Sequence, residues 1–195
     1  KKKNIIAANE GNAIALASGY HLATGKIGLV YMQNSGEGNA INPLTSLTDS
    51  DVYSIPILLI IGWRGEPGKK DEPQHVKMGK VTLDILDVLK IPYKILDDNY
   101  EDVINNTVEY MKSEKAPYAI VIKKGTFEDY KSKDNNKKNY ELDREEAIKT
   151  IVTLLNGNDA VISTTGKTSR ELFEFREEVK QRHEKDFLTV GSMGH

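Results

Sequence analysis

The chain has 195 residues, enough for one α/β domain and part of a second, and 38% of them are hydrophobic, as in ordinary globular proteins. It contains no cysteine, which excludes disulfides, thiolate metal sites and cysteine nucleophiles and fits the cytoplasmic location that we expect. With 27 basic and 29 acidic residues, its charge balance favours neither nucleic acid nor a membrane surface as a partner.

Short apolar runs alternate with longer helical patterns over the first two thirds of the chain. We expect four helices here: one at about residues 10–22, one directly after the turn at 33–39, and two more at 76–89 and 101–112. Residues 5–7 are expected to be the end of a strand, and four further strands are expected at 27–32, 56–61, 93–96 and 118–122. Strands that are apolar on both faces and separated by helices predict a doubly wound α/β domain with a parallel sheet. Ligands in such sheets bind beyond the carboxyl ends of the strands.

The composition changes after residue 123. Residues 131–139 lack periodicity and apolar anchors, which is typical of a solvated linker. A new pattern follows, with helices expected at 144–155 and 169–182 and strands at 160–163 and 187–190. We therefore predict a first domain over residues 1–123, a linker over 124–142, and the truncated start of a second α/β domain over 143–195.

Glu10 begins the first predicted helix, which is rich in alanine, serine and glycine. One interpretation is an acid stabilised by the helix dipole, a common arrangement. The functional interpretation is that small side chains let a flat ligand approach while a partly buried carboxylate exchanges a proton with it. Spacing alone favours the first interpretation.

Two segments follow the ends of predicted buried strands. The first, residues 34–39 (NSGEGN), is either a tight strand-to-helix turn or a loop whose backbone NH groups face a ligand. The second, residues 62–75, is either a long surface loop or a functional loop, and we weigh the two equally. It concentrates aromatic, cationic and polar residues, namely Trp63, Arg64, Lys69, Lys70, Gln74 and His75.

Several strings resemble thiamine diphosphate decarboxylases, in order and nearly end to end. Residues 8–15 (ANEGNAIA), 19–26 (GYHLATGK) and 32–39 (MQNSGEGN) are similar to landmarks of the pyrimidine-binding domain in that family. Residues 62–75 (GWRGEPGKKDEPQH) resemble phosphonopyruvate decarboxylases in particular, with sulfopyruvate decarboxylases as near relatives. Residues 164–172 (TTGKTSREL) and 190–195 (VGSMGH) resemble the start of the family's diphosphate-binding domain.

The resemblance implies a lyase of phosphonate biosynthesis that converts phosphonopyruvate to phosphonoacetaldehyde and CO₂ with thiamine diphosphate and Mg²⁺. Glu10 would hydrogen-bond the aminopyrimidine of the cofactor and so promote formation of the thiazolium ylide. By the same resemblance, the carbonyl of Gly191 contacts the cofactor's amino group, Met193 supports its bent shape, and Asn34 supports the cofactor or the substrate.

A phosphonate is a dianion beside a carboxylate, so the substrate requires fixed cations. We expect Arg64 first, and Lys69 or Lys70 second, to supply them, with Gln74 and His75 handling proton transfer. The resemblance places the magnesium ligands beyond His195, so we expect no metal ligand within the chain and no activity from the chain alone. It also implies a homodimer or a higher homo-oligomer, because the domains that share a cofactor in this family come from different subunits.

Two alternatives remain open at this stage. Within the same chemistry, the substrate is sulfopyruvate or another 2-keto acid, although two domain types on one chain argue mildly against sulfopyruvate. From another class, the chain is a non-catalytic α/β binding or assembly module, or an inactive fragment. The presence of Glu10 argues against such a module.

Overall fold

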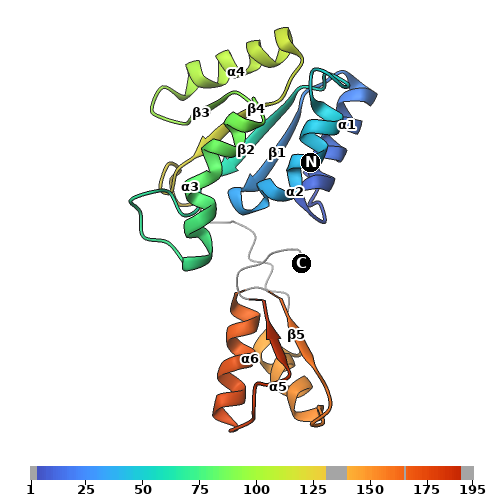
Figure 1. Ribbon diagram of the computed structural model, residues 1–195, viewed down its shortest axis with the longest axis vertical. Helices are drawn as coiled ribbons and strands as arrows, with labels where there is room; N and C mark the ends of the chain where they lie inside the picture. Colours follow the sequence, from blue (N-terminus) through green and yellow to red (C-terminus); the bar gives the residue numbers. More distant parts are fainter. Residues whose placement is uncertain (1–3, 131–139, 165, 190–195) are drawn as a thin grey trace. The chain divides into compact units, whose positions relative to one another are not determined.

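The computed structural model describes residues 4–130, 140–164 and 166–189 (Figure 1). Gly191 and Met193 therefore lie outside the described residues. The chain divides into two compact units between Asp129 and Tyr130, and each unit is considered by itself.

The first unit is built on a four-stranded parallel sheet with the order β1-β2-β4-β3 (Figure 1). Its strands are β1 (Gly28–Gln33), β2 (Ile57–Gly62), β3 (Tyr93–Ile95) and β4 (Tyr118–Ile122). The register places Val30 beside Leu59 and Leu59 beside Ala119, so one face presents a continuous row of buried apolar side chains. The parallel strands expected from the sequence are confirmed.

Helices cover both faces of this sheet. The helices are α1 (Glu10–Thr24), α2 (Glu37–Pro43), α3 (Pro73–Val88) and α4 (Tyr100–Glu114). The main core joins α1, α2 and α3 to one face of the sheet, through Ile14, Ala40 and Leu86. Val103 of α4 packs on the other face, against Ile120 and its neighbours. The doubly wound α/β class is thus confirmed.

Local signals explain most of the helix boundaries. The Asn9 side chain accepts a hydrogen bond from the Asn12 backbone N–H at 2.9 Å and caps α1, which ends at Gly25 in the left-handed conformation, with φ of 68°. The predicted start of α3 at residue 76 is wrong, because Pro73 already fits the first helical turn. The strand expected at residues 5–7 is also wrong, since these residues form no regular structure.

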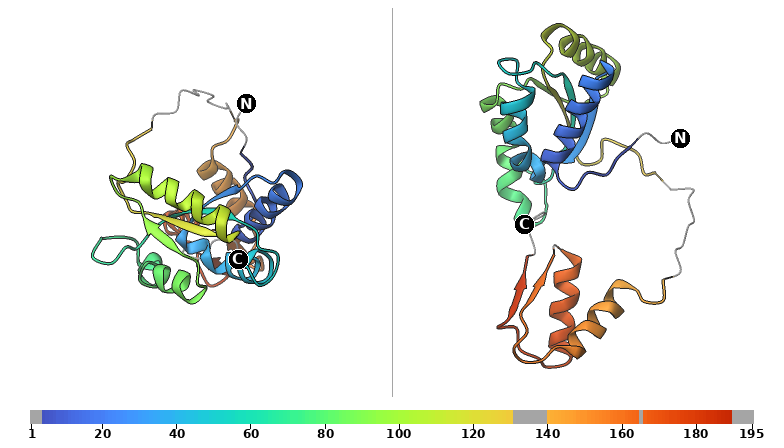
Figure 2. Two further views of the ribbon diagram at one scale, coloured as in Figure 1. Left: turned by 90° about the horizontal axis from the view of Figure 1, so that it is seen from above. Right: turned by 90° about the vertical axis from the view of Figure 1, so that its right-hand side faces the viewer.

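Over its described residues, the second unit consists of two parallel strands and two helices, which Figure 2 shows from two further sides. They are α5 (Arg144–Leu154), β5 (Val161–Ser163), α6 (Lys167–Glu178) and β6 (Asp186–Leu188). Val152, Leu172 and Phe175 form its core. Helix α6 begins two residues earlier than expected and ends four residues earlier. Within the described ranges of the chain, no helix is long and apolar enough to cross a membrane.

Candidate functional site

The polar residues singled out in the first unit gather at the carboxyl edge of its sheet. The segment after β1 begins with Asn34, and the loop after β2 begins with Trp63. Helix α1 directly precedes β1, and its N-terminus reaches the same edge, because a Cβ built on Gly36 would lie 2.2 Å from the Glu10 carboxyl carbon. The structure therefore brings Glu10 together with residues 34–39, where a doubly wound domain binds its ligands.

Glu10 is half-buried, and its Oε2 accepts a hydrogen bond of 2.9 Å from the side-chain amide of Asn39. No described residue hydrogen-bonds its Oε1, so that oxygen is free to accept from a ligand. The half-buried position agrees with the functional interpretation of Glu10, whose catalytic role stays a prediction.

Asn34 is fully buried and uses its amide within the protein. Its Nδ2 donates to the Arg64 carbonyl and to the Thr82 hydroxyl, both at 2.8 Å, and its Oδ1 accepts from the Arg64 backbone N–H at 3.0 Å. The amide thus ties the end of β1 to the loop after β2 and to α3. This geometry assigns Asn34 to support of the loop, and its expected contact with the cofactor stays a prediction.

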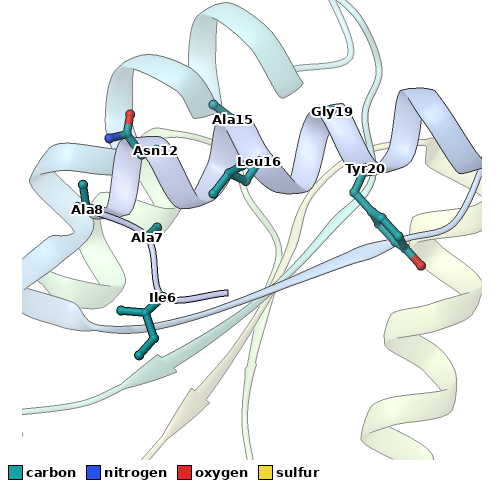
Figure 3. Close-up of a pocket in the computed structure, with 8 residues that line it drawn as sticks. All are labelled: Ile6, Ala7, Ala8, Asn12, Ala15, Leu16, Gly19 and Tyr20. Atoms are coloured by element: carbon teal, nitrogen blue, oxygen red, sulfur yellow. The ribbon is translucent and has the colours of Figure 1, made fainter. Parts of the chain in front are cut away.

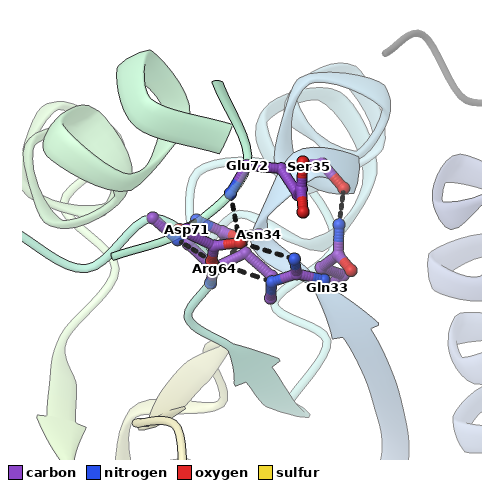
Figure 4. Close-up of polar contacts among 7 residues, drawn as sticks. Gln33, Asn34, Ser35, Arg64, Asp71 and Glu72 are labelled. Carbon is purple, nitrogen blue, oxygen red and sulfur yellow. Dashed lines mark hydrogen bonds and ion pairs between the residues drawn. The ribbon is translucent and has the colours of Figure 1, made fainter. Parts of the chain in front are cut away.

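Arg64 lies at the carboxyl end of β2 and forms a two-point ion pair with Asp71, which sequence analysis missed (Figure 4). The two N–H···O distances are 2.9 and 2.6 Å, and the backbone N–H groups of Gly65 and Glu72 also donate to the Asp71 carboxylate. The Arg64 guanidinium and these backbone donors hold the pKa of Asp71 far below its usual range. The charge of Arg64 is therefore already balanced, although 40% of its side chain is exposed.

Lys69 and Lys70 are exposed and form no ion pair with any described residue. Gln74 is also exposed, in the first turn of α3, while His75 is half-buried beside it. Burial, followed by the positive charge of Arg64, lowers the pKa of His75, so its imidazole is neutral at pH 7. A neutral imidazole can both donate and accept a proton, as proton transfer requires.

The loop after β2 is anchored to the body of the domain. The indole N–H of Trp63 donates to the carbonyl of Gly79 in α3 at 2.8 Å, and the Trp63 backbone N–H donates to the carbonyl of Ile122 at 2.8 Å. Gly65 has a φ of 67°, and a Cβ there would lie 2.0 Å from the His75 carbonyl oxygen. Glycine is required at this position both for the backbone conformation and for the close approach to α3.

A second buried acid, Glu37, was also missed from the sequence. It is buried together with Ala40 of α2 and with Leu44, which directly follows that helix. Only 4% of Glu37 is exposed, and both of its carboxylate oxygens lack a hydrogen-bond partner among the described residues. Burial raises the pKa of Glu37 to about 8. The spacing of residues 37, 40 and 44 along a helix was the available signal.

A separate apolar hollow lies on the outer side of α1 (Figure 3). Glu10 and Arg64 do not line it, so it differs from the polar site at the sheet edge. Its lining residues are Ile6, Ala7, Ala8, Asn12, Ala15, Leu16, Gly19 and Tyr20. Two of the small residues of α1 that were expected to admit a flat ligand, Ala15 and Gly19, line this hollow instead.

The residues at the edge fit one end of a thiamine cofactor. A half-buried carboxyl group with one oxygen that receives no hydrogen bond suits a ring nitrogen of an aminopyrimidine, because the two groups can exchange a proton. For the metal-binding end, the described residues contain no group of three or more histidine, aspartate or glutamate side chains placed to hold an ion.

Comparison with known proteins defines the class first. Residues 1–87 match the family model described as thiamine pyrophosphate enzyme, N-terminal TPP binding domain. This match covers α1, the segment after β1 and the loop after β2, which together form the candidate site.

Individual relatives then define the family. The chain is 33% identical to a phosphonopyruvate decarboxylase of Streptomyces viridochromogenes and 34% identical to one of Streptomyces hygroscopicus, over 95% of this chain and 49% of each relative. It is 37% identical to the sulfopyruvate decarboxylase subunit alpha of Methanococcus maripaludis, over 62% of this chain and 71% of the relative. The chain belongs to the family of thiamine-diphosphate-dependent decarboxylases that contains these proteins. It spans about half the length of the two Streptomyces relatives.

Proposed function

We propose that the protein decarboxylates phosphonopyruvate to phosphonoacetaldehyde and CO₂, with thiamine diphosphate as cofactor. The observation that carries this proposal is the position of Glu10, half-buried at the carboxyl edge of the sheet with one carboxylate oxygen free. The two Streptomyces relatives named for this reaction match 95% of the chain, which supports the proposal.

Thiamine diphosphate, when bound, supplies an electron sink for the bond that releases CO₂. Glu10 would accept or donate the proton at a ring nitrogen of the aminopyrimidine through its Oε1, which lies against Gly36 and receives no hydrogen bond from the described residues. His75, neutral at pH 7, would handle a second proton near the reacting carbon, and the exposed Gln74 beside it would assist by hydrogen bonding through its amide. Both lie in the first turn of α3, beside the loop after β2.

The loop after β2 would recognise the second acid group of the substrate. Lys69 and Lys70 are exposed cations, and the Arg64 side chain is partly exposed while its guanidinium pairs with Asp71. The two lysines therefore contribute the uncompensated positive charge, and Arg64 contributes N–H donors in a fixed orientation. Arg64 stays the first of these groups because its donors are fixed in orientation, although its charge is already balanced within the loop by Asp71.

The metal and the assembly complete the proposal. We assign Mg²⁺ to the diphosphate end of the cofactor, with ligands outside the described residues, and we assign Gly191 and Met193 to the cofactor's amino group and bent shape. Since the family pairs pyrimidine and diphosphate domains from different subunits, we propose a homodimer or a higher homo-oligomer. Light scattering of the complete protein measures this directly.

The direct test is an aldehyde-release assay on the complete protein, with and without thiamine diphosphate and Mg²⁺. We expect the Glu10→Gln variant to lose at least about 100-fold in kcat, because a positioned acid–base group contributes about that much or more. Glu101→Gln is the matched control, since Glu101 occupies the first turn of α4 and is exposed. Full activity of Glu10→Gln would contradict the proposed function.

Sulfopyruvate is the second candidate substrate, favoured by the match to sulfopyruvate decarboxylase subunits alpha over as much as 71% of the relative's length. The same assay separates the two candidates, with pyruvate as a substrate that lacks a second acid group. A higher kcat/KM for phosphonopyruvate than for sulfopyruvate supports the first proposal, and the reverse order supports the second.

A further inference from the structure

The α1–α2 contact holds the Glu10 carboxylate from two sides. Asn39 of α2 donates to Oε2 at 2.9 Å, and within the described residues it is the single side chain that hydrogen-bonds this carboxylate. On the other side lies the α-carbon of Gly36, where a Cβ would come within 2.2–2.3 Å of the Glu10 side chain. The carboxylate is therefore confined between an amide and a glycine.

A second glycine makes this arrangement possible. A Cβ built on Gly11 would lie 2.9 Å from the Asn39 backbone oxygen, so the start of α1 approaches α2 more closely than another residue would allow. Gly36 itself has φ of −88° and ψ of −5°, a conformation that any residue adopts. The space beside Glu10, and not the backbone conformation, is thus what requires glycine at position 36.

We infer that Asn39 is a positioning residue for the proton transfer of Glu10, an inference that rests on the proposed function. An amide nitrogen can only donate, so the hydrogen bond from Asn39 favours the ionised carboxylate and occupies Oε2. Oε1 is then the oxygen left for the ring nitrogen of the cofactor. Asn39 does not touch the reacting atoms and acts entirely through Glu10.

This role predicts energetic coupling between Asn39 and Glu10, which a purely structural role for Asn39 would not produce. The hydrogen bond to a charged group exists in the wild type and in variants that keep Glu10. In Glu10→Gln the acceptor is neutral, and most of the benefit from Asn39 is already lost. Substitution of Asn39 should therefore have a large effect beside Glu10 and a small effect beside the glutamine.

The experiment uses the complete protein as wild type, Asn39→Asp, Asn39→Ala, Glu10→Gln and the two double variants. Asn39→Asp is isosteric, and it replaces the donor by a second negative charge beside Glu10. Asn42→Ala is the matched control, because Asn42 lies on the same helix and is exposed, and its side-chain amide hydrogen-bonds only Ser46 among the described residues. The readouts are kcat and KM with phosphonopyruvate, and the Kd of thiamine diphosphate by calorimetry of the cofactor-free protein.

We expect Asn39→Ala to lower kcat by about 10- to 100-fold, the range of one hydrogen bond to a charged group, with a smaller change in KM. Asn39→Asp should have a larger effect and should move the acidic limb of the pH–rate profile to higher pH. Beside Glu10, we expect Asn39→Ala also to weaken the binding of thiamine diphosphate, whereas in the Glu10→Gln background either substitution should change its Kd by less than about threefold.

Equal effects of Asn39→Ala on the Kd in both backgrounds would overturn the inference, as would wild-type kinetics of Asn39→Asp. These outcomes leave the proposed function standing if Glu10→Gln alone abolishes turnover. If Glu10→Gln has full activity, the proposed function itself fails, so the two failures are distinguishable.

Discussion

Each of the two units contains an arginine–aspartate pair, and the pairs differ in exposure. In the second unit, the Nε of Arg176 lies 2.7 Å from Asp186, and the two side chains are only 11% and 1% exposed. His183 and Gln181 surround this pair. In the first unit, Arg64 pairs with Asp71 at the edge of the sheet, and 40% of the arginine side chain is exposed.

The comparison shows that an arginine–aspartate pair can either be closed off in a core or hold an arginine in place at the surface. A buried pair such as Arg176–Asp186 has no surface left for a ligand, and each charge depends on the other for compensation. At Arg64 the carboxylate receives two backbone N–H groups as well as the guanidinium. The arginine is therefore fixed by its partner and still reaches solvent, which is what a ligand-binding group needs.

The largest expected effect is on the free energy of unfolding, which should fall much more when the buried pair is broken than when the exposed pair is broken. Asp186→Asn leaves the buried Arg176 without its counter-charge, so we expect the unfolding free energy of the second unit to fall by about 3–5 kcal/mol. Asp71→Asn should cost about 1 kcal/mol, because solvent screens the half-exposed Arg64. Urea unfolding followed by circular dichroism measures both values. Equal losses would break the distinction drawn between the pairs.

Glu37 extends the comparison of the two ion pairs to a buried acid that has no partner at all among the described residues. Its pKa is raised from 4.5 to about 8, so the folded state binds its proton more tightly than the unfolded state. The protonated Glu37 therefore contributes to the free energy of unfolding, by about 5 kcal/mol at most. This contribution is fully present below pH 4.5 and is lost as the pH rises through 8. We expect Glu37→Gln to remove this loss and to stabilise the protein by about 3 kcal/mol at pH 9.

The check is urea unfolding of wild type and Glu37→Gln at pH 5, 7 and 9. The difference between their unfolding free energies should grow with pH. Glu72→Gln is a suitable control, since Glu72 is exposed near the same sheet edge. A difference that stays constant between pH 5 and 9 would show that Glu37 does not titrate in this range.

The smallest expected effects concern the substrate loop. Arg64→Ala should raise the KM for phosphonopyruvate about tenfold, the loss of one charged hydrogen-bonding group. Lys69→Ala and Lys70→Ala should each raise it only about two- to threefold, because exposed lysines are strongly hydrated and flexible. Steady-state kinetics of the complete protein at two salt concentrations measures these changes. An unchanged KM in Arg64→Ala would remove Arg64 from the substrate site.

Sequence reasoning identified the elements whose signals are local. The apolar runs at residues 27–32 and 56–61 predicted β1 and β2, and the small residues after Asn9 predicted α1, because strand and helix periodicities are properties of contiguous residues. The position of polar residues after strand ends then predicted a site at the carboxyl edge. The pattern also predicted the parallel sheet with helices on both faces.

The remaining features depend on contacts between distant residues. Asn34 contacts Thr82, 48 positions away, and Glu10 contacts Asn39, 29 positions away, so neither hydrogen bond has a signal in the neighbouring sequence. Asp71 was passed over because it stands between Lys70 and Glu72, and its pairing with Arg64, seven positions away, has no signal in the neighbouring sequence. Glu37 stands between two glycines in a segment that was interpreted as a turn or a ligand-facing loop, and its burial follows from the way α2 packs on the sheet.

Trp63 is the one tryptophan in the sequence, and its indole is held at the base of the loop by the Gly79 carbonyl. A single indole in this position is a built-in optical probe of the junction between the loop and α3. Its emission shifts to longer wavelength when the ring enters water, so loss of this junction in denaturant can be followed without attaching a dye.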